Sequence, residues 1–170
     1  MKATILWKSA VAHTVTYFIF GVISYVLFDY KEKFSSIEYA GILRSLDHPL
    51  VAAGPMFQPI RGLLFGLVFI ILGSRFFEDK RGWLKIWLIL FIVGILNTFA
   101  ATACSIEGMI YMPLPFWDHI TGIPEILFQS LAFSYVAWLW IRCPSKRWLG
   151  TTLHILFFLT LALSLLGFIA

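Results

Sequence analysis

The sequence predicts an all-helical integral membrane protein, a bundle of five transmembrane helices with a short interfacial helix on the outer side. The first observation is composition: 60% of the 170 residues are hydrophobic and 13% are charged. A soluble domain of this size could not hide so many apolar side chains in one core. The second is that the apolar residues form unbroken runs of about 20 residues, which suits helices that cross about 30 Å of hydrocarbon. We expect one transmembrane domain over residues 1–170.

Five spans account for the apolar runs, at residues 9–28, 59–77, 83–103, 124–141 and 148–168. The second is short, because the uncharged run between Arg61 and Arg75 covers only residues 62–74. Arg61 is therefore expected inside the membrane interface, where it needs a carboxylate partner or must extend to water. Gly62 and Gly66 form a small-xxx-small pair, which predicts a close approach by a neighbouring helix.

The segment between the first two spans is polar enough to leave the membrane. Ser35 and Glu38 form a capping box ahead of several apolar residues, which predicts the short interfacial helix. Pro49 biases the residue before it away from helical geometry, so the helix should end there. Asp47 and His48 are then expected at the membrane surface.

The basic residues predict the orientation of the chain. Four lie on the side opposite the N-terminus: Lys31, Lys33, Arg44 and Arg61. Nine lie on the N-terminal side: Lys2, Lys8, Arg75, Lys80, Arg81, Lys85, Arg142, Lys146 and Arg147. The positive-inside rule then places the N-terminus in the cytoplasm and the C-terminus outside, in a membrane that we take to be a bacterial inner membrane. The basic residues are scattered over the ends of the apolar segments and form no patch for nucleic acid. We therefore take them as topology signals and expect no nucleic-acid partner.

An internal repeat is suggested by two matching patterns. Asp47-His48 and Phe57-Gln58 recur 71 positions later as Asp118-His119 and Phe128-Gln129. Each pattern precedes a helix that runs from the outside inwards. We therefore predict two parallel hairpins, residues 47–103 and 118–168, with the first helix as an addition.

The repeat would bring the polar residues of the outer side together. Arg61 and Glu125 become neighbours, so we predict that they form an ion pair, with Glu107 as the competing partner. Neutral ligands to a solute are expected from polar side chains of the same region, namely Gln58, Gln129 and Asn97.

Histidines supply two cofactor hypotheses, although the sequence identifies no cofactor. Asp47, His48, Asp118 and His119 have the ligand chemistry of a zinc or other divalent site, or could supply a general base. Ordinary surface turns are the simpler interpretation, because the spacing matches no specific metal motif. His13 and His154 enter from the same inner side, as two axial haem ligands would, but core histidines with hydrogen-bond partners, or a proton-handling pair, are the favoured interpretation.

Transport or conduction of a small solute or cation is the function that charge within a thin bundle favours. A chain this short would need to oligomerise to enclose a path, and Gly62 with Gly66 is the expected contact between copies. Two alternatives stay open. One is a membrane-embedded enzyme for a lipid-linked or periplasmic substrate, with an Asp-His pair as base. The other is a non-catalytic subunit or sensor that binds a protein partner.

Overall fold

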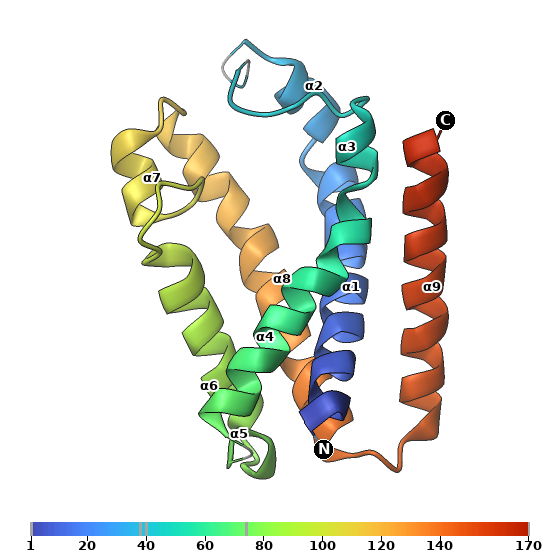
Figure 1. Ribbon diagram of the computed structural model, residues 1–170. Coiled ribbons are helices and arrows are strands. Elements are labelled where there is room, and N and C mark those ends of the chain that lie inside the picture. The colour runs from blue at the N-terminus through green and yellow to red at the C-terminus, as the bar shows by residue number, and fades with distance from the viewer. Residues whose placement is uncertain (1, 38, 40, 74, 170) are drawn as a thin grey trace.

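The computed structural model describes residues 2–37, 39, 41–73 and 75–169, and every regular element within them is a helix. Four helical segments of the described chain are long and apolar enough to cross a membrane: α1 (Lys2–Leu27), α8 (Phe116–Arg142), α9 (Arg147–Ile169) and Gly54–Leu72, which combines η1 (Gly54–Phe57) with α4 (Gln58–Leu72). Figure 1 shows them side by side, with the two termini at opposite ends of the molecule. The all-helical class is confirmed, with four candidate spans.

The predicted third span, residues 83–103, is not confirmed. Its described residues form α6 (Gly82–Leu88) and a π-helical segment, η2 (Ile89–Leu96), and the helix ends at Asn97. These 15 residues rise by about 22 Å at 1.5 Å per residue, which is less than the hydrocarbon thickness of about 30 Å. The helix ends at Asn97, whose backbone leaves helical geometry, and just beyond it the Thr98 hydroxyl accepts from the Ala100 N–H at 3.5 Å.

Helix α1 is the centre of the bundle, since it packs against α4, α8 and α9. All side chains from Lys8 to Thr16 are buried, and many of them are small. Gly62 and Gly66 of α4 lie directly against this helix: a Cβ atom added at Gly62 would be 2.5 Å from the Ala10 Cα. The predicted close approach therefore occurs within the chain. The prediction that these glycines join two copies is wrong, because α1 already covers them.

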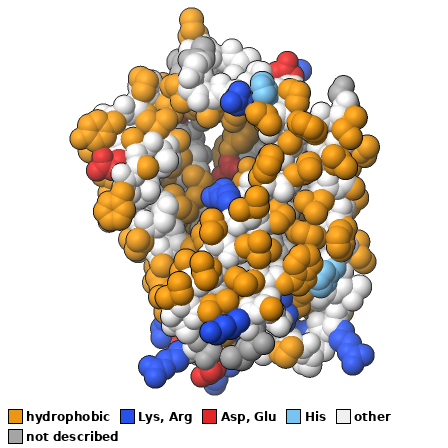
Figure 2. Space-filling view, in the orientation of Figure 1, with side chains coloured by type: hydrophobic (Ala, Val, Ile, Leu, Met, Phe, Trp, Pro, Cys, Tyr) orange, Lys and Arg blue, Asp and Glu red, His pale blue; other side chains and the backbone are white. Residues whose placement is uncertain are grey.

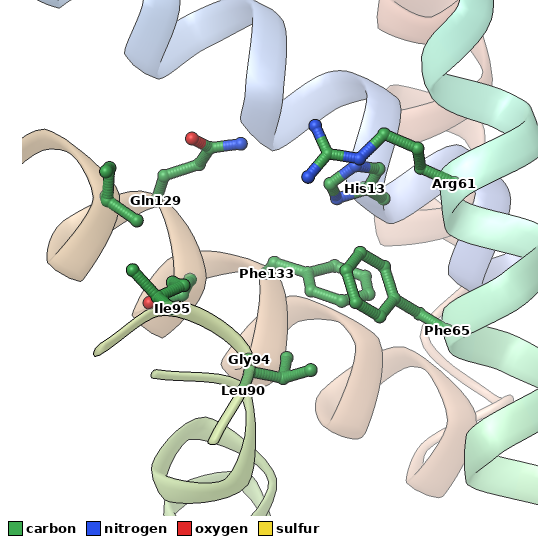
Figure 3. Close-up of a pocket in the computed structure, with 10 residues that line it drawn as sticks. His13, Arg61, Phe65, Leu90, Gly94, Ile95, Gln129 and Phe133 are labelled. Atoms are coloured by element: carbon green, nitrogen blue, oxygen red, sulfur yellow. The ribbon is translucent and has the colours of Figure 1, made fainter. Parts of the chain in front are cut away.

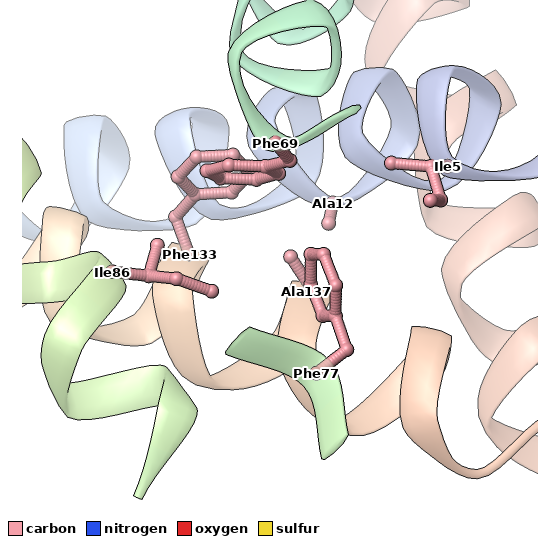
Figure 4. Packing of buried hydrophobic residues seen from close by; sticks show 7 residues of the cluster. All are labelled: Ile5, Ala12, Phe69, Phe77, Ile86, Phe133 and Ala137. Atoms are coloured by element: carbon pink, nitrogen blue, oxygen red, sulfur yellow. The ribbon is translucent and has the colours of Figure 1, made fainter. Parts of the chain in front are cut away.

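Two apolar clusters hold the helices together. The first joins α1, α4, α8 and the short helices α5 (Arg75–Glu78) and α6, and its seven side chains are shown in Figure 4: Ile5, Ala12, Phe69, Phe77, Ile86, Phe133 and Ala137. The second joins α1, α8 and α9 around Trp140 and Phe157. Apolar side chains also cover much of the outside, whereas Lys and Arg gather at the N-terminal end (Figure 2). A surface of this kind suits a lipid environment.

The segment between the first two candidate spans differs from the prediction. Helix α2 (Tyr30–Ser35) follows α1 directly, and the described residues from 36 to 47 form turns and extended chain in place of the predicted helix. Asp29 and Gly41 have positive φ angles of 45° and 82°, which interrupt helical geometry on either side. The Ser35 hydroxyl donates to the Glu32 carbonyl, and Glu38 lies outside the described residues.

The internal repeat is not confirmed either. Asp47 and His48 precede α3 (Pro49–Ala52), so three separate helical segments lie between them and the end of the second candidate span. Asp118 and His119 lie instead in the first turns of α8, which continues unbroken to Arg142. The two patterns have the same spacing in the sequence, but the first lies before a series of short helices and the second lies within one long helix.

Candidate functional site

Two connected cavities enter the bundle at the end opposite the N-terminus. The larger, here called the vestibule, has a volume of about 550 Å³ and lies between α1, α2, α8 and the segment after η2. The smaller, here called the inner pocket, has a volume of about 130 Å³. Both are lined by the same five residues, which makes them continuous: Arg61, Gly94, Ile95, Ile126 and Gln129. Figure 2 shows the side of the molecule hollowed in the half that contains α2 and α7 (Ile106–Tyr111).

Three helices bring polar side chains to the inner pocket. Arg61 comes from α4, His13 from α1 and Gln129 from α8, and the Arg61 guanidinium and the Gln129 amide face one another across it (Figure 3). Phe65 and Phe133 close the other side, with ring centroids 5.3 Å apart. The pocket is thus polar where it meets the vestibule and apolar at its inner end.

Gln58 fixes the hydrogen-bonding state of His13. The Gln58 Nε2 donates to the Gly54 carbonyl at 3.2 Å, so its Oε1 is the atom that accepts from Arg61 at 3.4 Å and lies 3.2 Å from His13 Nε2. His13 Nε2 must therefore carry the hydrogen. His13 Nδ1 is then a buried acceptor, and no described residue donates to it. A buried acceptor of this kind requires a donor from elsewhere.

The vestibule combines a carboxylate with aromatic side chains. Glu125 accepts a hydrogen bond from the Tyr30 hydroxyl, and the Ser24 hydroxyl lies within reach of the same carboxylate. Tyr17, Tyr30, Phe34 and Tyr39 line the surrounding wall. The sequence predicts no ligand role for any of these aromatic residues, because aromatics make up 18% of the chain and are too common to be informative. Only their position beside Glu125 makes them part of the site.

The predicted ion pair between Arg61 and Glu125 is not formed among the described residues. Both side chains line the vestibule and both lie close enough to Tyr17 to act on its hydroxyl, yet each hydrogen-bonds to a neutral group instead. The structure therefore brings the two charges into one cavity and leaves them apart.

The other predicted ligands divide into two groups. Gln58 and Gln129 belong to the site, the first as the link between Arg61 and His13 and the second in the walls of both cavities. Asn97 is exposed at the end of η2, and Glu107 is half-buried in the first turn of α7. Neither lines the vestibule or the inner pocket.

The four residues of the predicted metal site are not brought together. His48 Nδ1 accepts from the Leu50 N–H at 3.1 Å and caps α3, and His119 Nδ1 accepts from the Cys104 N–H at 3.1 Å. Asp47 is exposed, where a hydrogen bond from Ser45 lowers the pKa of its carboxyl, whereas Asp118 lines the vestibule. No group of three or more Cys, His, Asp or Glu within the described ranges could hold a metal ion.

The predicted haem ligands are also separate. Trp7 donates from Nε1 to His154 Nε2 at 2.9 Å, so the His154 Nδ1 carries the hydrogen and donates to the Gly150 carbonyl at 2.7 Å. No ring nitrogen of His154 is left for iron. His13 lies elsewhere, between Phe65 and Phe133. The structure thus does not bring the two histidines together as a ligand pair, and His154 instead connects α9 to Trp7 of α1.

Comparison of the chain with known protein families, with characterised proteins and with solved structures gives no match. The geometry of the vestibule and of the inner pocket is therefore what bears on function.

Proposed function

We propose that this protein is a component of a membrane transport system that binds a small polar solute in the inner pocket, with the vestibule as the entrance. One observation carries the proposal: Arg61 opens onto both cavities, about 10 Å along the helix from Gly54, in the midst of apolar helices. No acidic side chain of the described residues pairs with it. An ionisable group in such a place is costly, and the usual reason for its presence is a ligand or a pathway.

The closed inner end of the pocket favours a binding site with one entrance over an open pore. Phe65 and Phe133 form the end wall, and the apolar cluster around Phe69 and Ile86 lies beyond them. A solute that entered from the vestibule would stop at these rings. Release towards the N-terminal end would then require a rearrangement of α1, α4 and α8, as in a carrier.

The enzymatic alternative has less support. A general base needs a free ring nitrogen beside the reacting atoms. The Nδ1 atoms of His48 and His119 accept backbone hydrogen bonds, so in the neutral rings Nε2 carries the hydrogen and no acceptor nitrogen is left to act as a base. His119 is also almost completely buried.

Thiol labelling tests whether a solute can reach the pocket. The two free cysteines, Cys104 and Cys143, are replaced by alanine, and single cysteines are introduced at Gln129 or at Ser134. Both positions lie on α8, but Gln129 lines the two cavities whereas Ser134 is fully buried and serves as the matched control. The reagent is a charged methanethiosulfonate, which does not cross the membrane.

We expect the Gln129→Cys variant to react at least about tenfold faster than the Ser134→Cys variant, and from one side of the membrane only. The physical reason is that the reagent must arrive through water, which can reach Gln129 through the vestibule but cannot reach the fully buried Ser134. Equal, slow modification of both variants would overturn the proposed solute pocket.

A further inference from the structure

We infer that the solute is a zwitterion, with its anionic group at Arg61 and its ammonium group among Glu125 and the aromatic side chains of the vestibule. This inference rests on the proposed function, because it names the class of solute that the pocket would take. It comes from Arg61 and Glu125, two ionisable groups that share one cavity and hydrogen-bond to neutral groups among the described residues.

The anionic end of the site is built from donors. A guanidinium has five N–H donors, and among the described residues Arg61 donates to Gln58, at 3.4 Å. The remaining donors are open to the cavities, where the Gln129 amide faces them (Figure 3). A planar guanidinium of this kind matches a carboxylate or a phosphate, which it binds through two parallel hydrogen bonds.

The cationic end is built from a carboxylate and aromatic faces. The hydrogen-bond partners of Glu125 are the hydroxyls of Tyr30 and Ser24, which are neutral. Phe34 packs against Tyr30 and Tyr39, with ring centroids 5.3 Å and 6.2 Å apart, and all three line the vestibule with Glu125. Aromatic rings beside a carboxylate are the surroundings that an ammonium, above all a quaternary one, prefers.

A molecule with both charges fits this site better than one with either charge alone. Arg61 and Glu125 line the same cavity and both lie near Tyr17. A simple anion would leave the Glu125 carboxylate without an opposite charge, and a simple cation would leave the Arg61 guanidinium without one. A zwitterion compensates both. Its source is either a free solute or the head group of a zwitterionic lipid, which share this chemistry.

The test uses three probes of nearly equal shape on the purified full-length protein in a maltoside detergent. Glycine betaine carries both charges, 3,3-dimethylbutanoate carries only the carboxylate, and betaine amide carries only the quaternary ammonium. Equilibrium dialysis of each labelled probe gives its dissociation constant. We expect glycine betaine to bind at least about tenfold more tightly than either isostere, because each loses one charge-assisted contact.

Variants locate the two ends. Arg61→Gln and Glu125→Gln should each weaken betaine binding by about tenfold or more, whereas Glu107→Gln, on α7 and outside both cavities, should leave it unchanged. Competition by dihexanoylphosphatidylcholine separates the two sources: tighter binding than betaine indicates a lipid head group, and weaker binding indicates a free solute.

The comparison of probes on the unaltered protein does not depend on any variant folding. If betaine binds no better than its isosteres, or if none of the three binds, the zwitterion inference is overturned. Rapid labelling of the Gln129→Cys variant would in that case leave the proposed solute pocket standing. If the Gln129→Cys variant also failed to react faster than the Ser134→Cys variant, both the solute pocket and the zwitterion inference would be overturned.

Discussion

Gly62 decides how closely α4 approaches α1. A Cβ atom there would lie 2.5 Å from the Ala10 Cα and 2.8 Å from the Ser9 carbonyl oxygen, and both are backbone atoms that cannot turn aside. The Gly62→Ala substitution must therefore move one helix. Because α4 also carries Arg61, the same movement would disturb the site.

We expect Gly62→Ala to lower the free energy of unfolding by about 1–3 kcal/mol, the usual cost of overpacking. The measurement is the melting temperature of the purified protein in detergent. Gly21→Ala is the matched control, since nothing lies within 4 Å of a Cβ at that position of α1 and alanine is the better helix former. Similar melting temperatures for the two variants would contradict the close packing of α1 and α4.

Residue chemistry was the part of the site that could best be predicted from the sequence. Arg61, Gln58, Gln129 and Glu125 could be singled out because charged and amide groups are rare within apolar runs, and all four line the cavities or contact residues that do. Their partners could not be predicted. The choice of Tyr30 as the donor to Glu125 depends on the turn at Asp29, whose positive φ the sequence does not reveal.

At the scale of the elements, α8 ends with a carbonyl that its own helix cannot satisfy. The Trp140 carbonyl would ordinarily accept from the N–H of residue 144, but that residue is Pro144 and has no N–H. Lys8 of α1 supplies the donor: its Nζ lies 2.7 Å from the Trp140 oxygen and 5.3 Å from the centroid of the indole ring. One side chain thus caps the C-terminus of α8 and fastens it to α1.

Replacement of Lys8 by methionine should cost about 1–3 kcal/mol of stability, because a carbonyl loses a charge-assisted hydrogen bond in a poorly hydrated place. The loss should be smaller when Pro144 is changed to alanine, which restores an N–H near the same carbonyl. Melting temperatures of the two single variants and of the double variant form a cycle that isolates this coupling. Lys2→Met, at an exposed position of α1, is the control.

Additive effects of Lys8→Met and Pro144→Ala would show that the lysine does not stand in for the missing N–H. Destabilisation by Lys2→Met of the same size would show that the loss of any basic residue near the N-terminus has this effect.

Helix lengths were harder to predict than helical class. The run over residues 83–103 is apolar enough for a span, but hydropathy does not reveal that the helix leaves regular geometry at Asn97. The first candidate span begins at Lys2 rather than near residue 9, since Lys8 is held by a carbonyl of another helix and need not stay in water. In both cases the helix boundary depends on backbone geometry or on a backbone hydrogen bond, and the pattern of apolar residues in the sequence does not reveal either.

For the whole molecule, the cavities lie at the end opposite the one at which most Lys and Arg residues gather. Figure 1 places the N-terminus, the α5–α6 connection and the α8–α9 connection at one end, and Figure 2 shows Lys and Arg gathered there. The vestibule opens towards the other end, near α2.

Charge asymmetry then predicts which way the vestibule faces. Basic connections are retained in the cytoplasm during insertion, so the end with nine Lys and Arg should be cytoplasmic and the vestibule should open outside.

In bacterial cells, green fluorescent protein fused to the C-terminus should stay dark and alkaline phosphatase fused there should be active, because the first folds only in the cytoplasm and the second only after export. Fluorescent protein fused to the N-terminus is the control and should be bright. A fluorescent C-terminal fusion with inactive phosphatase would place both termini on one side, and the short helix Gly82–Leu96 would then have to be read as a segment that turns back within the membrane.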